Sequence, residues 1–172
     1  MFVAGMVAAS RRGMTFDRVR DTGVVLATLA GAVVIYTLIH VRAGRWGHVD
    51  ASARHERASL NMFLAAALLT AATFTGVVLQ AVHLGVALAL AALPVLAALL
   101  LSKWVKASLH MAFAAFATTL VWPSLRAVII GLLVVVAVAW SRLVLGRHTV
   151  PDIVVGTLLG FAAGGAYLAW DA

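Results

Sequence analysis

Apolar residues dominate the chain in six long stretches, lying roughly at 22–41, 60–80, 83–101, 108–124, 126–145 and 152–170. No acidic or basic residue stands in the centre of any of them. A helix that crosses the hydrocarbon core of a bilayer needs about 20 predominantly apolar residues. The pattern therefore predicts an all-α polytopic membrane protein, built as a bundle of six transmembrane helices.

The connections between these stretches differ in length and polarity. The links at 80–83 and 122–126 are tight turns, which force the helices on either side to be antiparallel neighbours. Polar residues gather instead at 42–59, 102–108 and 141–152. Counting membrane crossings places these three segments on one face, with both termini and both tight turns on the other. Ionisable residues gathered at one membrane rim indicate a functional site.

Composition agrees with this class. Of the 172 residues, 64% are hydrophobic and 11% are charged, whereas soluble domains average about 45–50% apolar and about 25% charged residues. Six spans leave no room for a soluble domain, so we expect a single membrane domain over 1–172, with a tail at 1–21 and the six-helix core at 22–170. The chain has no cysteine, which excludes disulfides, thiolate metal sites and a cysteine nucleophile.

The formal net charge is +7, and most of it comes from arginine. Arginine suits anionic headgroups and phosphate. For any single basic residue, an ordinary place in a membrane loop is an equally good explanation. The charge therefore favours a phosphate-bearing partner without identifying the residues that bind it.

The most informative polar segment is 141–152. His148 stands just before the predicted start of the last helix, where free backbone N–H groups favour an anion. Asp152 follows one turn later and is placed to accept a hydrogen bond from the His148 ring, which would leave the other ring nitrogen free to attack. Arg142 and Arg147 supply charge for phosphate oxygens. Singly, His148 reads as an interfacial residue and Asp152 as a helix-start carboxylate; together they favour a catalytic site.

Ser141, Arg142, His148 and Asp152 match the pattern SR-x5-H-x3-D. This pattern resembles the third signature of the type 2 phosphatidic acid phosphatase superfamily, which also includes vanadium haloperoxidases. The resemblance extends over about residues 42–165. It implies that His148 forms a phosphohistidine, that Asp152 orients His148, and that Arg142 holds the phosphate. The implied mechanism needs no metal and no cofactor.

The second signature of that superfamily commonly reads P-S-G-H, and residues 106–110 read K-A-S-L-H. Ser108 and His110 occupy the matching positions, and the K-x-S-x-H form resembles a branch of small membrane proteins. The resemblance implies that His110 is the general acid that protonates the leaving oxygen, and that Ser108 donates to the phosphate. Lys106 adds a cation. The alternative for His110 is a polar residue packed inside the bundle.

The first signature, K-x6-R-P, is matched least well. Arg57 takes the place of its arginine, but Asp50 stands where the lysine would be and Ala58 where the proline would be. The local D-x-x-x-R-x-E-R run resembles the same small branch. On that resemblance Arg57 and Arg54 are expected to be phosphate ligands, with Lys106 replacing the missing lysine charge.

The resemblance as a whole implies an integral membrane lipid phosphatase that hydrolyses a phosphomonoester or pyrophosphate. A polyprenyl phosphate is the favoured substrate, and phosphatidate or phosphatidylglycerophosphate stay open. The alternatives are a phosphotransferase of the same superfamily and a non-catalytic membrane protein of lipid transport or assembly. The expected partners are the bilayer and a lipid phosphate, and no nucleic acid; the oligomeric state is open.

Two opposing indications bear on which side of the membrane the site faces. The face of the termini carries five basic residues and the site face carries eight, so positive-inside counting alone favours a cytoplasmic site. Several of the eight are accounted for by phosphate binding, and the resemblance implies an outward-facing site. The Arg- and Ala-rich composition is typical of a GC-rich bacterium. We therefore expect a bacterial plasma membrane protein with an extracytoplasmic site opposite both termini.

Overall fold

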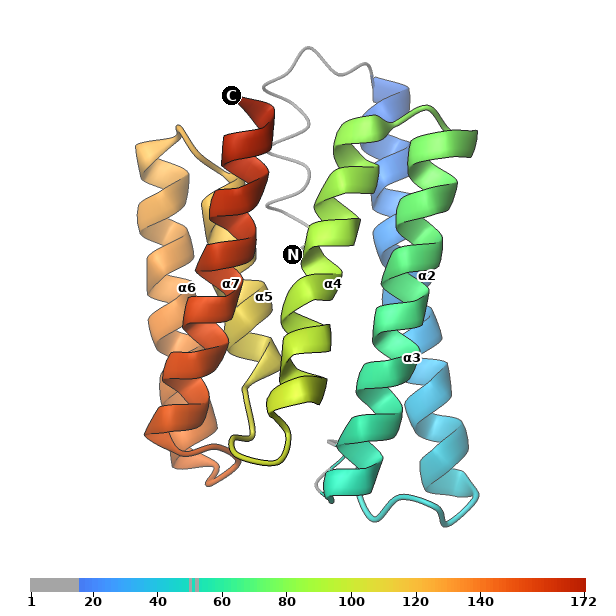
Figure 1. Ribbon diagram of the computed structural model, residues 1–172, viewed down its shortest axis with the longest axis vertical. Coiled ribbons are helices and arrows are strands. Elements are labelled where there is room, and N and C mark those ends of the chain that lie inside the picture. The colour runs from blue at the N-terminus through green and yellow to red at the C-terminus, as the bar shows by residue number, and fades with distance from the viewer. Residues whose placement is uncertain (1–15, 50, 52) are drawn as a thin grey trace.

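The computed structural model describes residues 16–49, 51 and 53–172, and in these residues it contains six α-helices and no strand. The α-helices are α2 (Phe16–Arg42), α3 (Arg54–Thr73), α4 (Val82–Leu101), α5 (Leu109–Leu120), α6 (Leu125–Val144) and α7 (Val150–Asp171) (Figure 1). A π-helical segment, Phe74–Val78, continues α3. The predicted all-α fold is confirmed.

Five of the α-helices are long and apolar enough to cross a membrane, and the exception is α5. Its 12 residues span about 18 Å at the rise of an α-helix, against a hydrocarbon core of about 30 Å. The expected span over 108–124 is therefore too long. The helix stops short of Pro123, whose ring disfavours helical geometry at the preceding residue, and 102–108 approaches it without a regular helix. Met111 and Phe116 are buried, so other parts of the protein cover α5. Such cover is needed beside a short helix, because lipid could not hydrogen-bond to the N–H and C=O groups of the non-helical backbone next to it.

The first described helix begins earlier than predicted. Residues 16–21 were expected to belong to an N-terminal tail, but α2 starts at Phe16; residues 1–15 of that tail lie outside the described residues. With 27 residues, α2 is longer than a bilayer core requires. Hydropathy marked only its apolar part, because the first turns carry charges such as the exposed ion pair between Arg20 and Asp21.

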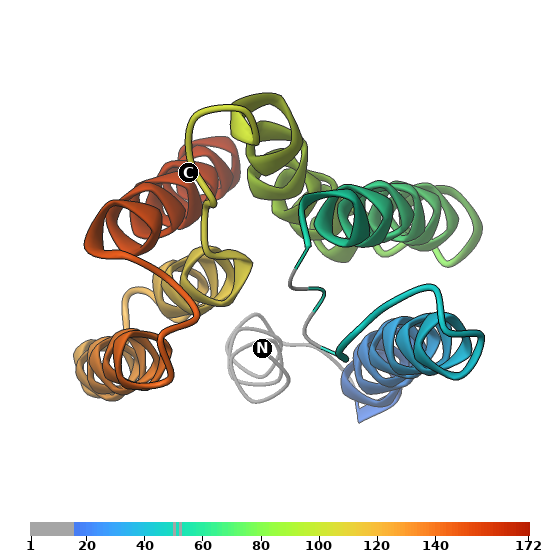
Figure 2. The same ribbon diagram turned by 90° about the horizontal axis from the view of Figure 1, so that it is seen from below.

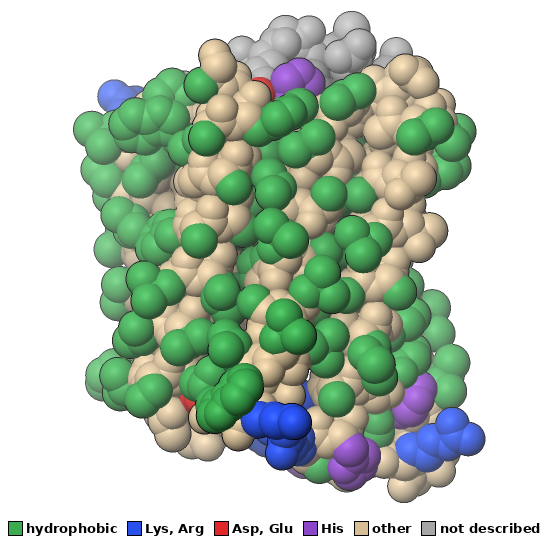
Figure 3. Space-filling view, in the orientation of Figure 1, with side chains coloured by type: hydrophobic (Ala, Val, Ile, Leu, Met, Phe, Trp, Pro, Cys, Tyr) green, Lys and Arg blue, Asp and Glu red, His purple; other side chains and the backbone are tan. Residues whose placement is uncertain are grey.

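The helices alternate in direction, so their connections fall at two ends of the bundle (Figure 1). The connections after α2, α4 and α6 lie at one end, which we call the site end, and the C-terminus lies at the other. The three polar segments therefore share one end, as predicted; the N-terminus lies outside the described residues. Basic and histidine side chains gather at the site end, while the sides of the molecule are mostly apolar (Figure 3).

The core joins four of the helices. Buried Leu68 of α3, Val95 of α4, Phe116 of α5 and Ala163 of α7 belong to one cluster. Figure 2, viewed from the site end, shows α2 and α6 on the periphery. Both expose apolar side chains along their length, as expected of helices that contact lipid.

Glycines set the distance between α5 and α7. Gly156, Gly160 and Gly164 recur at four-residue spacing on the side of α7 that faces α5. A Cβ on Gly160 would collide with the carbonyl oxygen of Ala112, which is backbone and cannot turn away. Small residues allow two membrane helices to approach this closely. This small-residue pattern therefore serves packing within the chain.

Candidate active site

A tight turn at 145–149 carries the predicted nucleophile. Gly146 has a φ of +61°, a left-handed conformation that glycine adopts without steric cost and that commonly ends helices. The carbonyl oxygen of Arg142 accepts hydrogen bonds from the backbone N–H groups of Arg147 at 3.1 Å and His148 at 3.4 Å. His148 is thereby held beside the end of α6 and immediately before α7.

Asp152 fastens the start of α7 to the segment 102–108. Its side chain is almost fully buried. Oδ2 accepts the backbone N–H of Thr149 at 2.8 Å, and Oδ1 accepts the backbone N–H of Lys106 at 2.9 Å. The main-chain oxygen of Asp152 also accepts the N–H of Ser108 at 3.1 Å. Two stretches more than 40 residues apart in the chain are thus joined at one carboxylate.

The ring of His148 faces the Lys106 peptide. Its Nδ1 lies 3.2 Å from the carbonyl oxygen of Lys106 and 3.9 Å from Oδ2 of Asp152. The direct hydrogen bond expected between His148 and Asp152 is not formed at that distance, and both carboxylate oxygens already accept main-chain N–H groups. A carbonyl oxygen can only accept, so Nδ1 is the protonated nitrogen of the neutral ring and Nε2 keeps its lone pair.

The surroundings of His148 favour its neutral form. Burial lowers the pKa of His148 below its ordinary value of 6.5, and the positive charges of Lys106 and Arg142 lower it further. The Lys106 ammonium lies close by, donating to the carbonyl oxygen of Arg147 at 2.8 Å. A neutral imidazole is the form that can attack phosphorus.

This electrostatic coupling predicts a shift in pH dependence. Protonation of His148 would remove the lone pair that the predicted nucleophile needs. The midpoint of the acidic limb of kcat/KM for phosphate release should therefore lie below pH 6.5. Lys106→Met removes one of the charges that lower the pKa of His148. The acidic limb should therefore move to higher pH, and the maximum value of kcat/KM should fall. Lys103→Met, in the same segment but exposed, is the matched control. A limb unmoved in Lys106→Met would show that His148 does not set it.

The other two residues of the second signature lie on different sides of the start of α5. Ser108 is fully buried, and its Oγ finds no hydrogen-bond partner among the residues that the structure describes. His110 is the second residue of α5 and is exposed. Ser108 is the extended residue before the helix and His110 lies in its first turn, so one is buried and the other is exposed. The roles expected for Ser108 and His110 stay predictions.

The start of α3 repeats the arrangement found at the start of α7. Glu56 is buried; Oε2 accepts the backbone N–H of Ala53 at 2.9 Å, and Oε1 accepts that of Gly47 at 2.8 Å. One carboxylate again caps a helix and fixes a loop, here the loop between α2 and α3. This fixes the first turn of α3, which carries Arg54 and Arg57.

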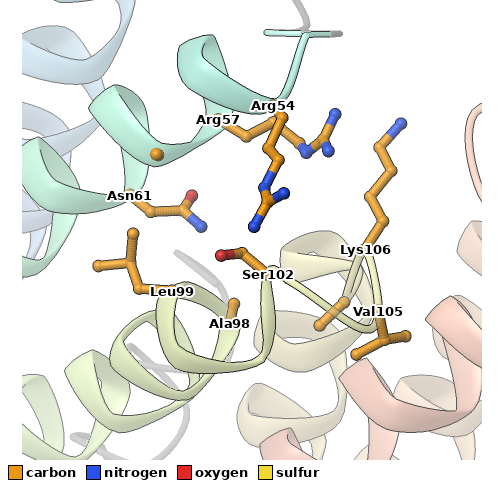
Figure 4. Close-up of a pocket in the computed structure, with 10 residues that line it drawn as sticks. Arg54, Arg57, Asn61, Ala98, Leu99, Ser102, Val105 and Lys106 are labelled. Atoms are coloured by element: carbon orange, nitrogen blue, oxygen red, sulfur yellow. The ribbon is translucent and has the colours of Figure 1, made fainter.

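Arg54 and Arg57 line a small, partly open cavity between the start of α3 and the end of α4 (Figure 4). Lys106 lines it from the connecting segment. Asn61 and Ser102 also line it, and sequence reasoning missed both. A signal was present for Asn61: it is the single asparagine of the chain and lies one helical turn after Arg57 on the same face.

Apart from His110, the predicted site residues thus fall into two groups at the site end. His148, Asp152, Ser108 and Lys106 are joined by hydrogen bonds or close contacts, with the main chain of Arg142 beside them. Arg54 and Arg57 lie at the cavity, which His148 does not line. Lys106 belongs to both groups.

The group around His148 lies in the part of the chain that matches a known family, and Arg54 and Arg57 lie outside it. The sequence profile of the PAP2 superfamily matches residues 83–172, which contain α5, α6 and α7 with every predicted site residue except Arg54 and Arg57. No curated protein and no solved structure matches the chain. The profile covers more than half of the chain, and apolar helices of membrane-spanning length lie both before the matched residues and among them. The chain belongs to the PAP2 superfamily, as a small membrane protein of that family.

Proposed function

We propose that the protein is an integral membrane lipid phosphatase that works through a phosphohistidine at His148. The observation that carries the proposal is the setting of this ring. It is partly buried and favoured in its neutral form, and Nδ1 faces the Lys106 carbonyl so that Nε2 is left to attack. Family membership gives the reaction type its support.

In the proposed reaction, Nε2 of His148 attacks phosphorus and the bond from phosphorus to the leaving oxygen breaks. His110 gives its proton to that oxygen. Water then attacks the phosphohistidine, His110 takes up the water's proton, and inorganic phosphate leaves His148 free. A positioned acid of this kind contributes about 10²–10⁴ in rate.

Charge stabilisation supports the same proposal. Arg142 and Lys106 are expected to neutralise the phosphate during transfer, and such charge stabilisation is typically a large contribution in phosphoryl transfer. Asp152 acts on His148 through the Lys106 peptide that both contact. Ser108 is expected to donate to the phosphate, and Arg54 and Arg57 to attract the anionic headgroup toward the rim.

The site lies at one end of a bundle with apolar sides (Figure 3), which favours a substrate whose headgroup sits at the membrane rim while its chain stays in lipid. A polyprenyl phosphate or diphosphate fits this arrangement best, and phosphatidate and phosphatidylglycerophosphate are the other candidates. We place the protein in a bacterial plasma membrane with the site extracytoplasmic.

A panel of lipid phosphates tests the proposal. Purified protein in detergent should release inorganic phosphate from at least one of them, and vanadate should inhibit. Brief incubation with ³²P-labelled substrate, followed by alkaline quenching, should trap label on the protein in an acid-labile form typical of phosphohistidine. A folded protein that releases no phosphate from any member of the panel would rule the function out.

A further inference from the structure

Four aromatic side chains meet between α2 and α3 at the site end, and we call them the α2–α3 aromatic cluster: Tyr36, His40, Trp46 and Phe63. The rings of Tyr36 and Phe63 are stacked, with their centroids 4.1 Å apart. The ring of His40 lies 4.2 Å from that of Tyr36 and 4.8 Å from that of the buried Trp46. The hydroxyl groups of Tyr36 and Ser59 are hydrogen-bonded at 2.8 Å. The cluster therefore joins α2, the loop after it and α3 through contacts that depend on direction.

The first turns of α3 have little support from the core of the bundle. Apart from Glu56, the buried residues of α3 begin only at Ala65. Before that point, the side of α3 toward α4 borders the cavity that Arg54 and Arg57 line. Helices in lipid are held together by close packing and by hydrogen bonds between them. The orientation of these first turns therefore depends on contacts at the other side of α3.

That other side is the one that the α2–α3 aromatic cluster and its loop contact. At about 100° per residue, Glu56, Ser59 and Phe63 fall within an arc of about 60° around α3. Glu56 accepts the backbone N–H of Gly47, in the loop after α2, at 2.8 Å. Ser59 and Phe63 both contact Tyr36 of α2. One face of α3 is thus tied to α2 and its loop over about two helical turns.

The basic residues of α3 lie on nearly the opposite face. Arg54, Arg57 and Asn61 fall within a second arc of about 60° by the same helical spacing. All three line the cavity next to α4, and Figure 4 shows Arg54 and Asn61 directed toward Ser102. Any rotation of the first turns of α3 about the helix axis would move both faces together. The contacts on one face therefore set the direction of the side chains on the other.

We infer that the α2–α3 aromatic cluster sets the rotation of the first turns of α3, and so aims Arg54 and Arg57 toward the end of α4. Tyr36 and Ser59 are then positioning residues, which act on the substrate through these two arginines. The inference rests on the proposed function, in which Arg54 and Arg57 attract the anionic headgroup. It gives a part in substrate binding to α2, which lies outside the residues that match the family profile.

A cross-linking experiment tests the rotation of α3 without any need for activity. Asn61→Cys and Leu99→Cys place two thiols on the α3 and α4 walls of the cavity, in a chain that has no other cysteine. A short thiol-specific cross-linker should join them readily when the cluster is intact. Adding Tyr36→Leu removes the ring contacts and the hydrogen bond, and the rate of cross-linking should fall several-fold. A rate that Tyr36→Leu leaves unchanged would overturn the inference.

Kinetics test whether this rotation matters for substrate binding. With a lipid phosphate that the protein hydrolyses, Tyr36→Leu should raise KM about tenfold, as expected when hydrogen bonds to a charged group are weakened, with kcat little changed. Tyr36→Phe keeps the ring contacts and loses only the bond to Ser59, so its KM should lie between those of Tyr36→Leu and the wild type. In a protein that already carries Arg54→Met and Arg57→Met, Tyr36→Leu should change KM little, because the side chains through which it acts are absent.

A second tyrosine provides the control. Tyr167 is buried near the C-terminal end of α7, at the end of the bundle opposite the site. Tyr167→Leu should lower the unfolding temperature but leave cross-linking and KM unchanged. An unchanged KM in Tyr36→Leu, or a rise in KM that persists without the two arginines, would overturn the positioning role and leave the phosphatase standing. A wild-type protein that releases phosphate from no lipid phosphate would overturn the proposed function, and the positioning role with it.

Discussion

Replacing His148 by alanine is expected to lower phosphate release by about 10⁴-fold or more. The substitution removes the atom that would form the bond to phosphorus, and loss of a nucleophile leaves only the contributions of binding and charge stabilisation. The remaining cations should still hold the substrate, so KM should change much less than kcat. Single-turnover phosphate release by purified protein in detergent, together with the ³²P label on the protein, measures both losses.

His83→Ala is the matched control, because it also replaces a histidine with alanine. His83 lies at the end of the bundle opposite the site, where its Nδ1 pairs with Asp171 at 3.1 Å. It should retain nearly full activity. If His148→Ala kept wild-type turnover while remaining folded, the phosphohistidine mechanism would be untenable.

Gly160→Ala is expected to destabilise the protein by about 3 kcal/mol. The added methyl group would meet the backbone of Ala112 on α5, and overpacking typically costs about 1–3 kcal/mol even where side chains can adjust. Here α5 and α7 would have to move apart, and α5 carries Ser108 and His110 at its start. Thermal unfolding in detergent should show the loss, and activity should fall with it.

Gly165→Ala offers a close comparison on the same helix, since a Cβ at Gly165 meets nothing within 4 Å. Alanine there should leave stability unchanged, or raise it by about 0.5–1 kcal/mol, because glycine in a helix interior is unfavourable. Equal effects of the two substitutions would show that the α5–α7 contact is not as close as described.

Hydropathy predicted the helices well because lipid imposes one simple requirement on them. All six apolar stretches are helices, and their polar connections lie at one end. It failed at α5, because an apolar sequence does not reveal whether the helix that it forms is exposed to lipid or enclosed by other helices. It also failed at 16–21, where charged residues continue the helix beyond the apolar part.

The sequence predicts those parts of the site that depend on the identity of a side chain, and it does not predict the main-chain contacts. The signature spacing brought together His148 and Asp152, but their actual link runs through the Lys106 peptide. Any residue type has that carbonyl and that N–H, so no sequence pattern marks them. Asn61 and Ser102 were missed because they meet only when α3 packs against α4.

The carboxylates at the starts of α3 and α7 fix the backbone of the site end before any substrate binds. Glu56 and Asp152 each hold two main-chain N–H groups from separate segments, so the loops at the site end are set in place by the folded helices. A scaffold fixed in this way does not have to rearrange its dipoles as charge develops on a substrate, and this absence of reorganisation is a main source of enzymatic rate acceleration.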